Sequence, residues 1–203
     1  MATPLGFDRR LTWDDFRKVA VSPHPKRYDA QTGVAVNWSS KVSYGPKGSW
    51  KTTKVKVEVL LVSRETWVVK GKESVDLLSH EQGHYDIYAI AARTLQTRLE
   101  SLSGDRSQSF NKTSDAIVRS IIGKATRRTG RHKGIIVQEG LVQEIDHAYD
   151  EGIVTGTNHG QAKTNQSVWK HNIDNAHLSP EGTLGDLLMF FPGDFPVQRQ
   201  DFG

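Results

Sequence analysis

The 203-residue sequence predicts an α+β fold, in which a small antiparallel sheet is followed by and packed against several helices. Polar and apolar residues alternate over residues 34–44 and again over residues 50–62, as they do in strands with one face in water. From about residue 73 onward, apolar residues recur every three or four positions, which is typical of helices. The length suits one domain that spans residues 1–203.

The two alternating segments predict a β-hairpin. Between them lies "GPKGS", residues 45–49, which is typical of a turn. The second segment, "WKTTKVKVEVLLV", places Val55, Val57 and Val59 on one face and charged residues on the other. We therefore expect the two strands to pair, with one face of the hairpin in water.

The helical period predicts four helices after the hairpin. The stretch "RRTGRHKG", residues 127–134, and the stretch before Gln161 are expected to be loops. The C-terminal segment from about residue 180 to residue 203 is rich in Gly and Pro, so we expect it to be an irregular tail. The four helical segments are residues 73–102, 113–128, 135–149 and 161–177.

The composition excludes several kinds of site. The chain has no cysteine, so disulfides and thiolate ligands are absent, and any metal must be held by histidine, carboxylate or water. No run approaches the ~18 consecutive apolar residues of a membrane helix, so we expect no membrane insertion. Residues 1–13 are charged where a secretory signal needs an apolar core. Either the protein is made without such a signal or the sequence begins after one, and its localisation stays open.

The strongest motif is "HEQGH" at residues 80–84, which matches the pattern H-E-x-x-H. Residues four apart on a helix project from one face about one turn apart, so His80 and His84 can reach a single ion. Zinc accepts neutral imidazole nitrogen, and a catalytic zinc site has three protein ligands and one open position. Because the motif lies inside the helix expected at 73–102, we favour a Zn2+ site over a chance match.

Glu81 lies about 100° around the helix from His80, so it is poorly placed as a direct ligand. Its carboxylate can instead lean toward a metal-bound water, whose pKa falls to near 7. A carboxylate can take a proton from such a water at neutral pH. We therefore expect Glu81 to be the general base, and afterwards the general acid, of a hydrolysis.

The third ligand has to come from elsewhere in the chain. His159 stands out because it lies in a Gly-bearing loop, "TNHG", where a side chain can be aimed into a cleft. Asp150, Glu151 and Glu144 are rival oxygen ligands. Spacing alone does not choose between these four residues.

Three segments carry a resemblance to a known family: "LTWDDFR" at 11–17, "LLSHEQGHYDIYAIAAR" at 77–93, and "YDEGIVTGTNHGQAKTNQSVWKHNI" at 149–173. They resemble a bacterial family of zinc peptidases known as domain of unknown function 922, within the H-E-x-x-H metallopeptidase group. The middle segment is the most specific of the three. The loop after Tyr149 and Asp150 is longer here than in the family pattern.

The resemblance implies a zincin-like fold with the active-site helix at about 73–102. It implies that His80 and His84 bind zinc and that Glu81 is the catalytic acid and base. It also implies His159 as the third ligand, because that position matches the Thr-x-His-Gly of the family. The implied activity is hydrolysis of peptide bonds in a polypeptide substrate, and the implied location is outside the cytoplasm.

Hydrolysis also needs a donor for the oxygen that becomes negative during the reaction. Tyr149 is a candidate because it lies near the third-ligand loop, and the alternative is a core tyrosine on an apolar helix face. For substrate binding, the strand at 50–62 is a candidate edge for pairing with an extended peptide. Its lysines equally suit protection of an edge strand from aggregation.

The formal net charge of +4 leaves room for rival functions. Basic residues cluster at 124–133 and at 47–56, which would suit a nucleic-acid-associated protein. No known nucleic-acid motif accompanies them, so nucleic acid is not the favoured partner and a solvated basic surface is the simpler interpretation. A non-catalytic metal-binding interaction domain is the other rival, although structural zinc has no need of Glu81.

Overall fold

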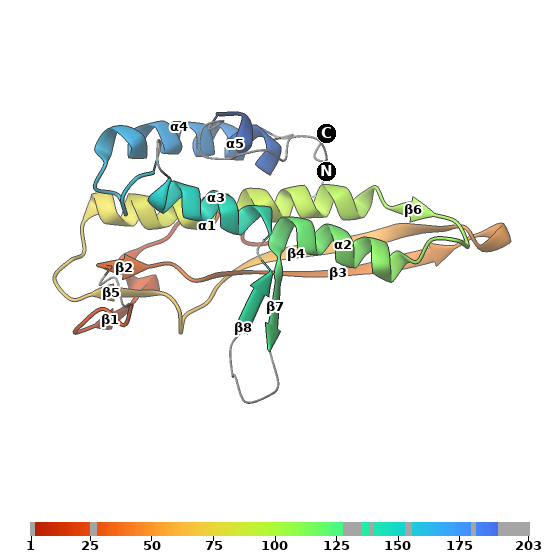
Figure 1. Ribbon diagram of the computed structural model, residues 1–203, viewed down its shortest axis with the longest axis horizontal. Helices are drawn as coiled ribbons and strands as arrows, with labels where there is room; N and C mark the ends of the chain where they lie inside the picture. Colours follow the sequence, from red (N-terminus) through yellow and green to blue (C-terminus); the bar gives the residue numbers. More distant parts are fainter. Residues whose placement is uncertain are drawn as a thin grey trace.

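The computed structural model describes residues 3–24, 28–127, 135–138, 140–152, 156–179 and 182–190. Within these residues the chain is a mixed α+β structure, which confirms the predicted class in its coarse form (Figure 1). The helices are α1 (Val75–Glu100), α2 (Phe110–Ile122), α3 (Leu141–Glu151), α4 (Lys163–Leu178) and α5 (Leu184–Phe190). No helix in the described part of the chain is both long and apolar enough to span a membrane.

The described strands form two three-stranded sheets and one hairpin. The sheets have the orders β1-β5-β2 and β3-β4-β6, and the hairpin joins β7 to β8. In the first sheet β1 runs parallel to β5, so this sheet is mixed rather than antiparallel. The strands are β1 (Arg17–Val19), β2 (Ala30–Gln31), β3 (Val34–Tyr44), β4 (Trp50–Leu61), β5 (Trp67–Val69), β6 (Ser103–Gly104), β7 (Lys124–Arg127) and β8 (Ile135–Gln138).

The predicted hairpin is present as β3 and β4. Their register runs from Val34 opposite Leu61 to Tyr44 opposite Trp50, with one irregularity between Lys41 and Val42. The alternation of residue types is what produces it, because one face of the pair packs on α1 and the other is in water. The hairpin extends along α1 and beyond its C-terminal end (Figure 1).

Helix α1 is the central element. It begins at the N-cap Ser74, whose hydroxyl accepts a hydrogen bond from the amide of Leu77 at 3.1 Å. It packs against β3 and β4 on one side and against α2, α3, α4 and α5 on others. Figure 1 shows the strands beneath it and α4 and α5 above it. Because α1 is covered on several sides, polar side chains in its N-terminal half are buried and need partners from neighbouring elements.

Two of the predicted helices are wrong in part. The segment 113–128 was expected to be one helix, but α2 ends at Ile122 because Gly123 adopts a left-handed backbone with φ 77°. The segment 135–149 was also expected to be helical, but its first residues form β8, which pairs with β7. Most of the basic loop predicted at 127–134 lies outside the described residues.

The expected irregular tail is also corrected in part. Residues 184–190 form α5, and Leu184 and Leu187 are fully buried because this short helix packs against α1, α3 and α4. Residues 191–203 lie outside the described part of the chain. The sheet β1-β5-β2 was not predicted, since its strands have only two or three residues each and give no periodic signal.

Candidate metal centre

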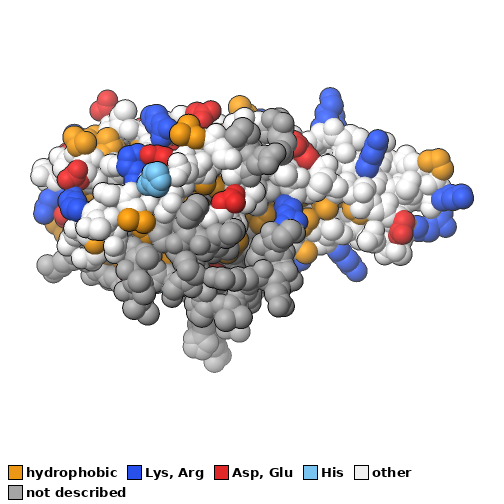
Figure 2. Space-filling view, turned by 90° about the horizontal axis from the view of Figure 1, so that it is seen from above, with side chains coloured by type: hydrophobic (Ala, Val, Ile, Leu, Met, Phe, Trp, Pro, Cys, Tyr) orange, Lys and Arg blue, Asp and Glu red, His pale blue; other side chains and the backbone are white. Residues whose placement is uncertain are grey.

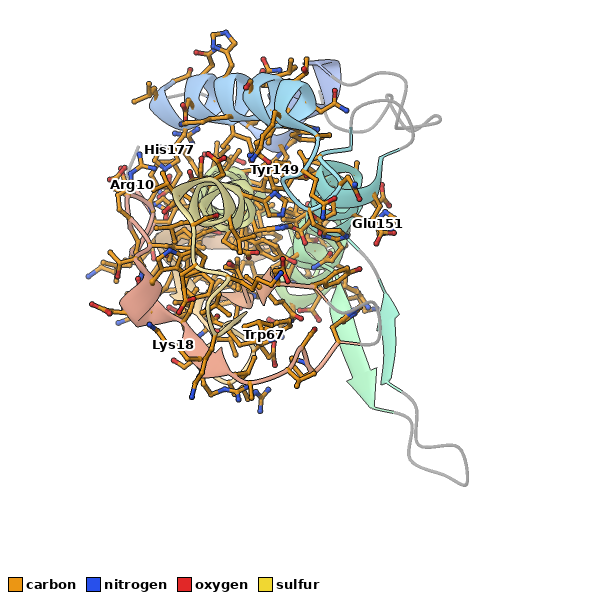
Figure 3. All side chains as sticks on the ribbon, turned by 90° about the vertical axis from the view of Figure 1, so that its left-hand side faces the viewer. Arg10, Lys18, Trp67, Tyr149, Glu151 and His177 are labelled. Carbon is orange, nitrogen blue, oxygen red and sulfur yellow. The ribbon has the colours of Figure 1, made fainter. Side chains whose placement is uncertain are left out.

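A cleft of about 1130 Å³ lies at the N-terminal end of α1. Its walls come from α1, from α3, from the loop that follows α3, and from the segment 28–34 that contains β2. Figure 3 looks at this end of the molecule, with Tyr149 lying between α1 and α4 and with Glu151 farther out on α3. The cleft therefore opens where two helices and one short sheet edge meet.

Two pairs of residues, each four apart on a helix, face one another at the base of this cleft. Helix α1 contributes His80 and His84, and α3 contributes Asp146 and Asp150. Residues at this spacing lie on one face of a helix about one turn apart. The packing of α1 against α3 thus brings two imidazoles and two carboxylates together from two helices that are distant in sequence.

Three of these side chains converge on one point. The Nε2 atoms of His80 and His84 are 3.1 Å apart, and Oδ1 of Asp150 lies 3.1 Å from the first and 3.2 Å from the second. Ligands at 2.0–2.1 Å from a tetrahedral zinc ion are about 3.4 Å from one another. The separations therefore suit three ligands of a single small cation, and these three residues form the metal-capable group in the described part of the chain.

The state of the Asp150 oxygen gives an independent test of this fit. Its Oδ1 atom is buried and has no hydrogen-bond partner of acceptable geometry, although two ring nitrogens are nearby. A buried carboxylate oxygen without a hydrogen bond costs free energy unless a charge compensates for it. A cation at the point of convergence would provide that charge. The donor set of two imidazole nitrogens and one carboxylate oxygen is also one that zinc accepts.

The other ring nitrogen of each histidine is held by an oxygen atom. Nδ1 of His84 donates to Oδ1 of Asp146 at 2.7 Å, and Nδ1 of His80 donates to Oε1 of Gln166 in α4 at 3.0 Å. The hydroxyl of Thr157 lies 3.4 Å from Nδ1 of His80. With the proton held on Nδ1, the lone pair of neutral imidazole is on Nε2 and points at the shared site. Such outer partners orient metal-binding histidines.

Charges at the cluster are strongly coupled. Burial by itself would lower the pKa of His84, but the carboxylates of Asp150 and Asp146 outweigh it and raise that pKa well above its usual value. Burial would raise the pKa of Asp150, but His84, His159 and His80 outweigh it and hold that pKa well below its usual range. The two carboxylates thus favour a positive charge at this point, which a bound cation would supply.

Glu81 is buried, lines the cleft and has one hydrogen-bond partner that no local sequence pattern indicates. The hydroxyl of Thr32 donates to Oε2 of Glu81 at 2.6 Å. Thr32 lies between β2 and β3, so the wall of the cleft opposite α1 fixes the carboxylate. Glu81 lines the same cleft as His80, His84 and Asp150.

The structure brings His159 to the cleft but not into the group of three. Its Nδ1 atom lies 3.2 Å from Oδ2 of Asp150, and its ring centroid is 6.4 Å from that of His80. The ring also contacts Tyr28, with 4.0 Å between centroids. His159 is therefore next to the second oxygen of Asp150, and its assignment as the third ligand stays a prediction.

The other two rival ligands lie farther from the centre. Glu151 accepts a hydrogen bond from the hydroxyl of Tyr28 at 3.0 Å and lies 3.5 Å from His147 and 3.7 Å from His159. Glu144 is exposed on α3 and does not line the cleft. Of the four candidates left open by the sequence, Asp150 is thus the one with an oxygen at the point of convergence.

Tyr149 occupies the position of a core residue. Its side chain is fully buried, its ring stacks on His80 with 4.8 Å between centroids, and its hydroxyl donates to the carbonyl oxygen of His80 at 3.1 Å. The amide of Gln166 donates to the same hydroxyl at 2.6 Å. Because the hydroxyl proton is held by the backbone of α1, this geometry favours the structural alternative over the role of oxyanion donor.

Gly83 of the motif serves this same contact. A Cβ atom at residue 83 would lie 2.3 Å from the hydroxyl oxygen of Tyr149 and 2.6 Å from Cζ. Tyr149 is fully buried, so its side chain has no room to move away from such a Cβ atom. The glycine between the two histidines is therefore required by the close packing of α3 on α1.

The strand suggested for substrate pairing, β4, does not line the cleft. The wall opposite α1 is formed by residues 28–34, and the contribution of strand residues comes from β2 and the start of β3. β4 lies between β3 and β6 in its own sheet. The expectation for residues 50–62 is thus corrected; β2, which has two residues, is too short to show a periodic pattern in the sequence.

Comparison of the chain with models of protein families, with curated proteins and with solved structures gives no match in any of the three cases. The inference from this site therefore depends on its own geometry and chemistry.

Proposed function

We propose that this protein is a zinc-dependent metallopeptidase with a zincin-like arrangement, in which α1 carries two of the three ligands and the general base. The observation that supports the proposal is the convergence of Nε2 of His80, Nε2 of His84 and Oδ1 of Asp150 within 3.1–3.2 Å of one another, next to Glu81 and at the base of an open cleft. Three protein ligands and access for solvent are the features of a catalytic rather than a structural zinc site.

In the proposed site, His80, His84 and Asp150 hold the ion, while Asp146 and Gln166 keep both imidazoles in the required tautomer. When bound, zinc supplies a Lewis acid that polarises the scissile carbonyl and makes a water more acidic. Glu81 accepts the proton of the attacking water and then gives it to the leaving amine.

The residues around Glu81 adapt it to this role. Thr32 binds one carboxylate oxygen, which leaves the other free to accept a proton, and it holds the side chain in one rotamer. The cleft of about 1130 Å³ has room for several residues of an extended polypeptide. A polypeptide is therefore the substrate class that we propose.

The decisive experiment combines metal analysis with a protease assay on quenched fluorescent casein. We expect about one zinc per chain, loss of hydrolysis with a chelator, and recovery when zinc is added back. The Glu81→Gln variant should keep the metal and lose hydrolysis, because it keeps the shape of the side chain but cannot accept the proton.

Glu100→Gln, at the other end of α1, is the matched control and should behave as the unchanged protein. Equal hydrolysis by the Glu81→Gln variant would contradict the catalytic role of Glu81. Failure of the purified chain to bind zinc would contradict the whole proposal.

A further inference from the structure

One face of the β3–β4 hairpin carries several lysines, away from the metal centre. The ladder places Lys41 opposite Lys54, Ser39 opposite Lys56 and Ser43 opposite Lys51. Residues 39, 41 and 43 alternate along β3, so they and their partners share one face of the hairpin. We call this surface, made by Lys41, Lys51, Lys54 and Lys56, the lysine face.

The lysine face is exposed, and the other face of the hairpin is the one that packs on the core. All four lysines are exposed, whereas Val57 and Val59 on the opposite face are buried against the body of the protein. Figure 2 shows lysine and arginine side chains distributed over the part of the molecule that projects on the right. The lysines are therefore not needed to cover the core.

The arrangement of these charges is unfavourable for the isolated chain. Lys41 and Lys54 are direct cross-strand neighbours, and like charges at such positions destabilise a sheet. A lysine stripe that only protects an edge from aggregation does not require this pairing, because one charge per ladder position is enough. The doubled charge suggests a ligand that compensates for it.

Four lysines elsewhere on the described surface are paired with carboxylates, whereas those of the lysine face are not. Lys18, Lys72, Lys163 and Lys170 lie within 2.7–3.5 Å of Glu73, Asp29, Asp76 and Asp174 respectively. No described residue forms an ion pair with any lysine of the lysine face. Glu58 on the same face and Glu100 at the end of α1 form no ion pair with these lysines.

The shape of this surface is linear. Along β4, Lys54 and Lys56 are two residues apart, which corresponds to about 6.8 Å, or two steps of the roughly 3.4 Å rise between phosphates on one nucleic-acid strand. A groove of about 560 Å³ is lined by Lys41, Lys54 and Lys56 and also by Glu100. At the tip of the hairpin, Tyr44 is 74% exposed and lies opposite Trp50, on the face of the ladder that does not carry the lysines.

We propose that the lysine face binds the phosphate backbone of nucleic acid. Its lysines neutralise phosphates spaced along the strand, and these contacts do not depend on base sequence. An anionic membrane fits less well, because binding at a bilayer surface uses a row of apolar side chains beside the charges. Among the described residues of the hairpin, Tyr44 is the one large apolar side chain that is well exposed, so the hairpin has no such row.

The test is fluorescence anisotropy of a fluorescein-labelled oligo(dT) strand, and of a duplex of equal length, titrated with the full chain over a series of KCl concentrations. The expected slope of log K against log salt is about −3, from four phosphate contacts at about 0.7 each. The Lys54→Glu/Lys56→Glu variant should weaken binding at least about tenfold at low salt and reduce the slope by about 1.4.

Lys70→Glu/Lys112→Glu is the matched control, because both lysines are exposed, lie outside the hairpin and give the same change in net charge. This control should bind within about twofold of the unchanged chain. Equal loss in both variants, or full binding by the hairpin variant, would overturn the proposal, since net charge or another basic segment would then explain the binding. Binding to phosphatidylserine vesicles or to polyglutamate without binding to either oligonucleotide would also overturn it. Circular dichroism of each variant verifies that it is folded.

Discussion

The candidate metal ligands on the helices α1 and α3 differ from the candidate in the loop after α3 in how the backbone holds them. His80 and His84 lie on α1, and Asp146 and Asp150 lie on α3, so regular helix geometry sets the spacing within each pair. His159 instead lies in a loop where it and both neighbours adopt left-handed backbones, with φ of 47° for Asn158, 51° for His159 and 77° for Gly160.

A left-handed backbone costs a residue other than glycine about 1–2 kcal/mol, so this loop needs external support. That support comes from the end of α3, whose carbonyl oxygens at Tyr149 and Asp150 accept hydrogen bonds from the amides of Thr157 and Asn158 at 2.8 and 2.9 Å. The positions of the two helix-borne pairs thus follow from the packing of α1 on α3, whereas the position of the His159 loop depends on hydrogen bonds to the end of α3. The variants below test that order of dependence, beginning with the largest effect.

Removal of a helix-borne imidazole should have the largest effect. We expect His84→Ala to weaken zinc binding on the order of a thousandfold, because a zinc-binding free energy of about 10–16 kcal/mol shared among three protein ligands is about 3–5 kcal/mol for each. Competition with a fluorescent zinc chelator measures the change. His171→Ala, an exposed histidine on α4, is the control and should leave the affinity unaltered.

The next comparison decides between carboxylate and loop histidine as third ligand. If Asp150 is the ligand, Asp150→Ala should weaken zinc binding about a hundredfold or more, and His159→Ala should weaken it only about tenfold, as loss of an outer partner does. The same competition assay compares the two variants. The opposite ranking would assign His159 as the ligand and Asp150 as its partner.

Loss of an outer carboxylate should have an intermediate effect. Asp146→Asn keeps the size of the side chain but weakens the acceptor of the His84 Nδ1 proton, so zinc affinity should fall about 10- to 100-fold. Asp174→Asn, on the exposed side of α4, is the control. An unchanged affinity for the Asp146 variant would mean that the packing of α1, rather than this hydrogen bond, orients the ring.

The smallest expected effect concerns Thr32, and this prediction depends on the proposed function. Thr32→Val removes the hydrogen bond to Glu81, so kcat for casein-derived peptides should fall about tenfold while zinc content and KM stay near their original values. Thr32→Ser should restore kcat, because it returns the hydroxyl. A loss of zinc in the valine variant would instead indicate a structural role for Thr32.

The elements that could be predicted are those with a long periodic pattern. β3, β4 and α1 all have one, and the structure places them within about two residues of the expected bounds. β8 was mistaken for the start of a helix because "IIVQ" is apolar and has too few residues to reveal a period. β1, β2 and β5 are shorter still and depend on contacts between segments far apart in the chain.

The same distinction applies to the metal centre. His80, Glu81 and His84 share one helical turn, so a local pattern reveals them. Asp146 and Asp150 also have helical spacing, within "IDHAYD", but two carboxylates four apart on a helix are common and carry little signal on their own. The roles of Thr32 and Gln166 arise from contacts across 49 and 86 residues of sequence, which no local pattern contains.

One consequence follows from the way α1 and α3 each contribute one pair to the cluster. A slip of α3 by a single residue, about 1.5 Å along its axis, would move both carboxylates out of reach of both imidazoles at the same time. A bound cation would thus cross-link two helices whose facing residues are 62 positions apart in the sequence. At a free concentration a thousand times its dissociation constant, it would add about 4 kcal/mol to the unfolding free energy. A rise in melting temperature on addition of the cation would then measure its binding without any substrate.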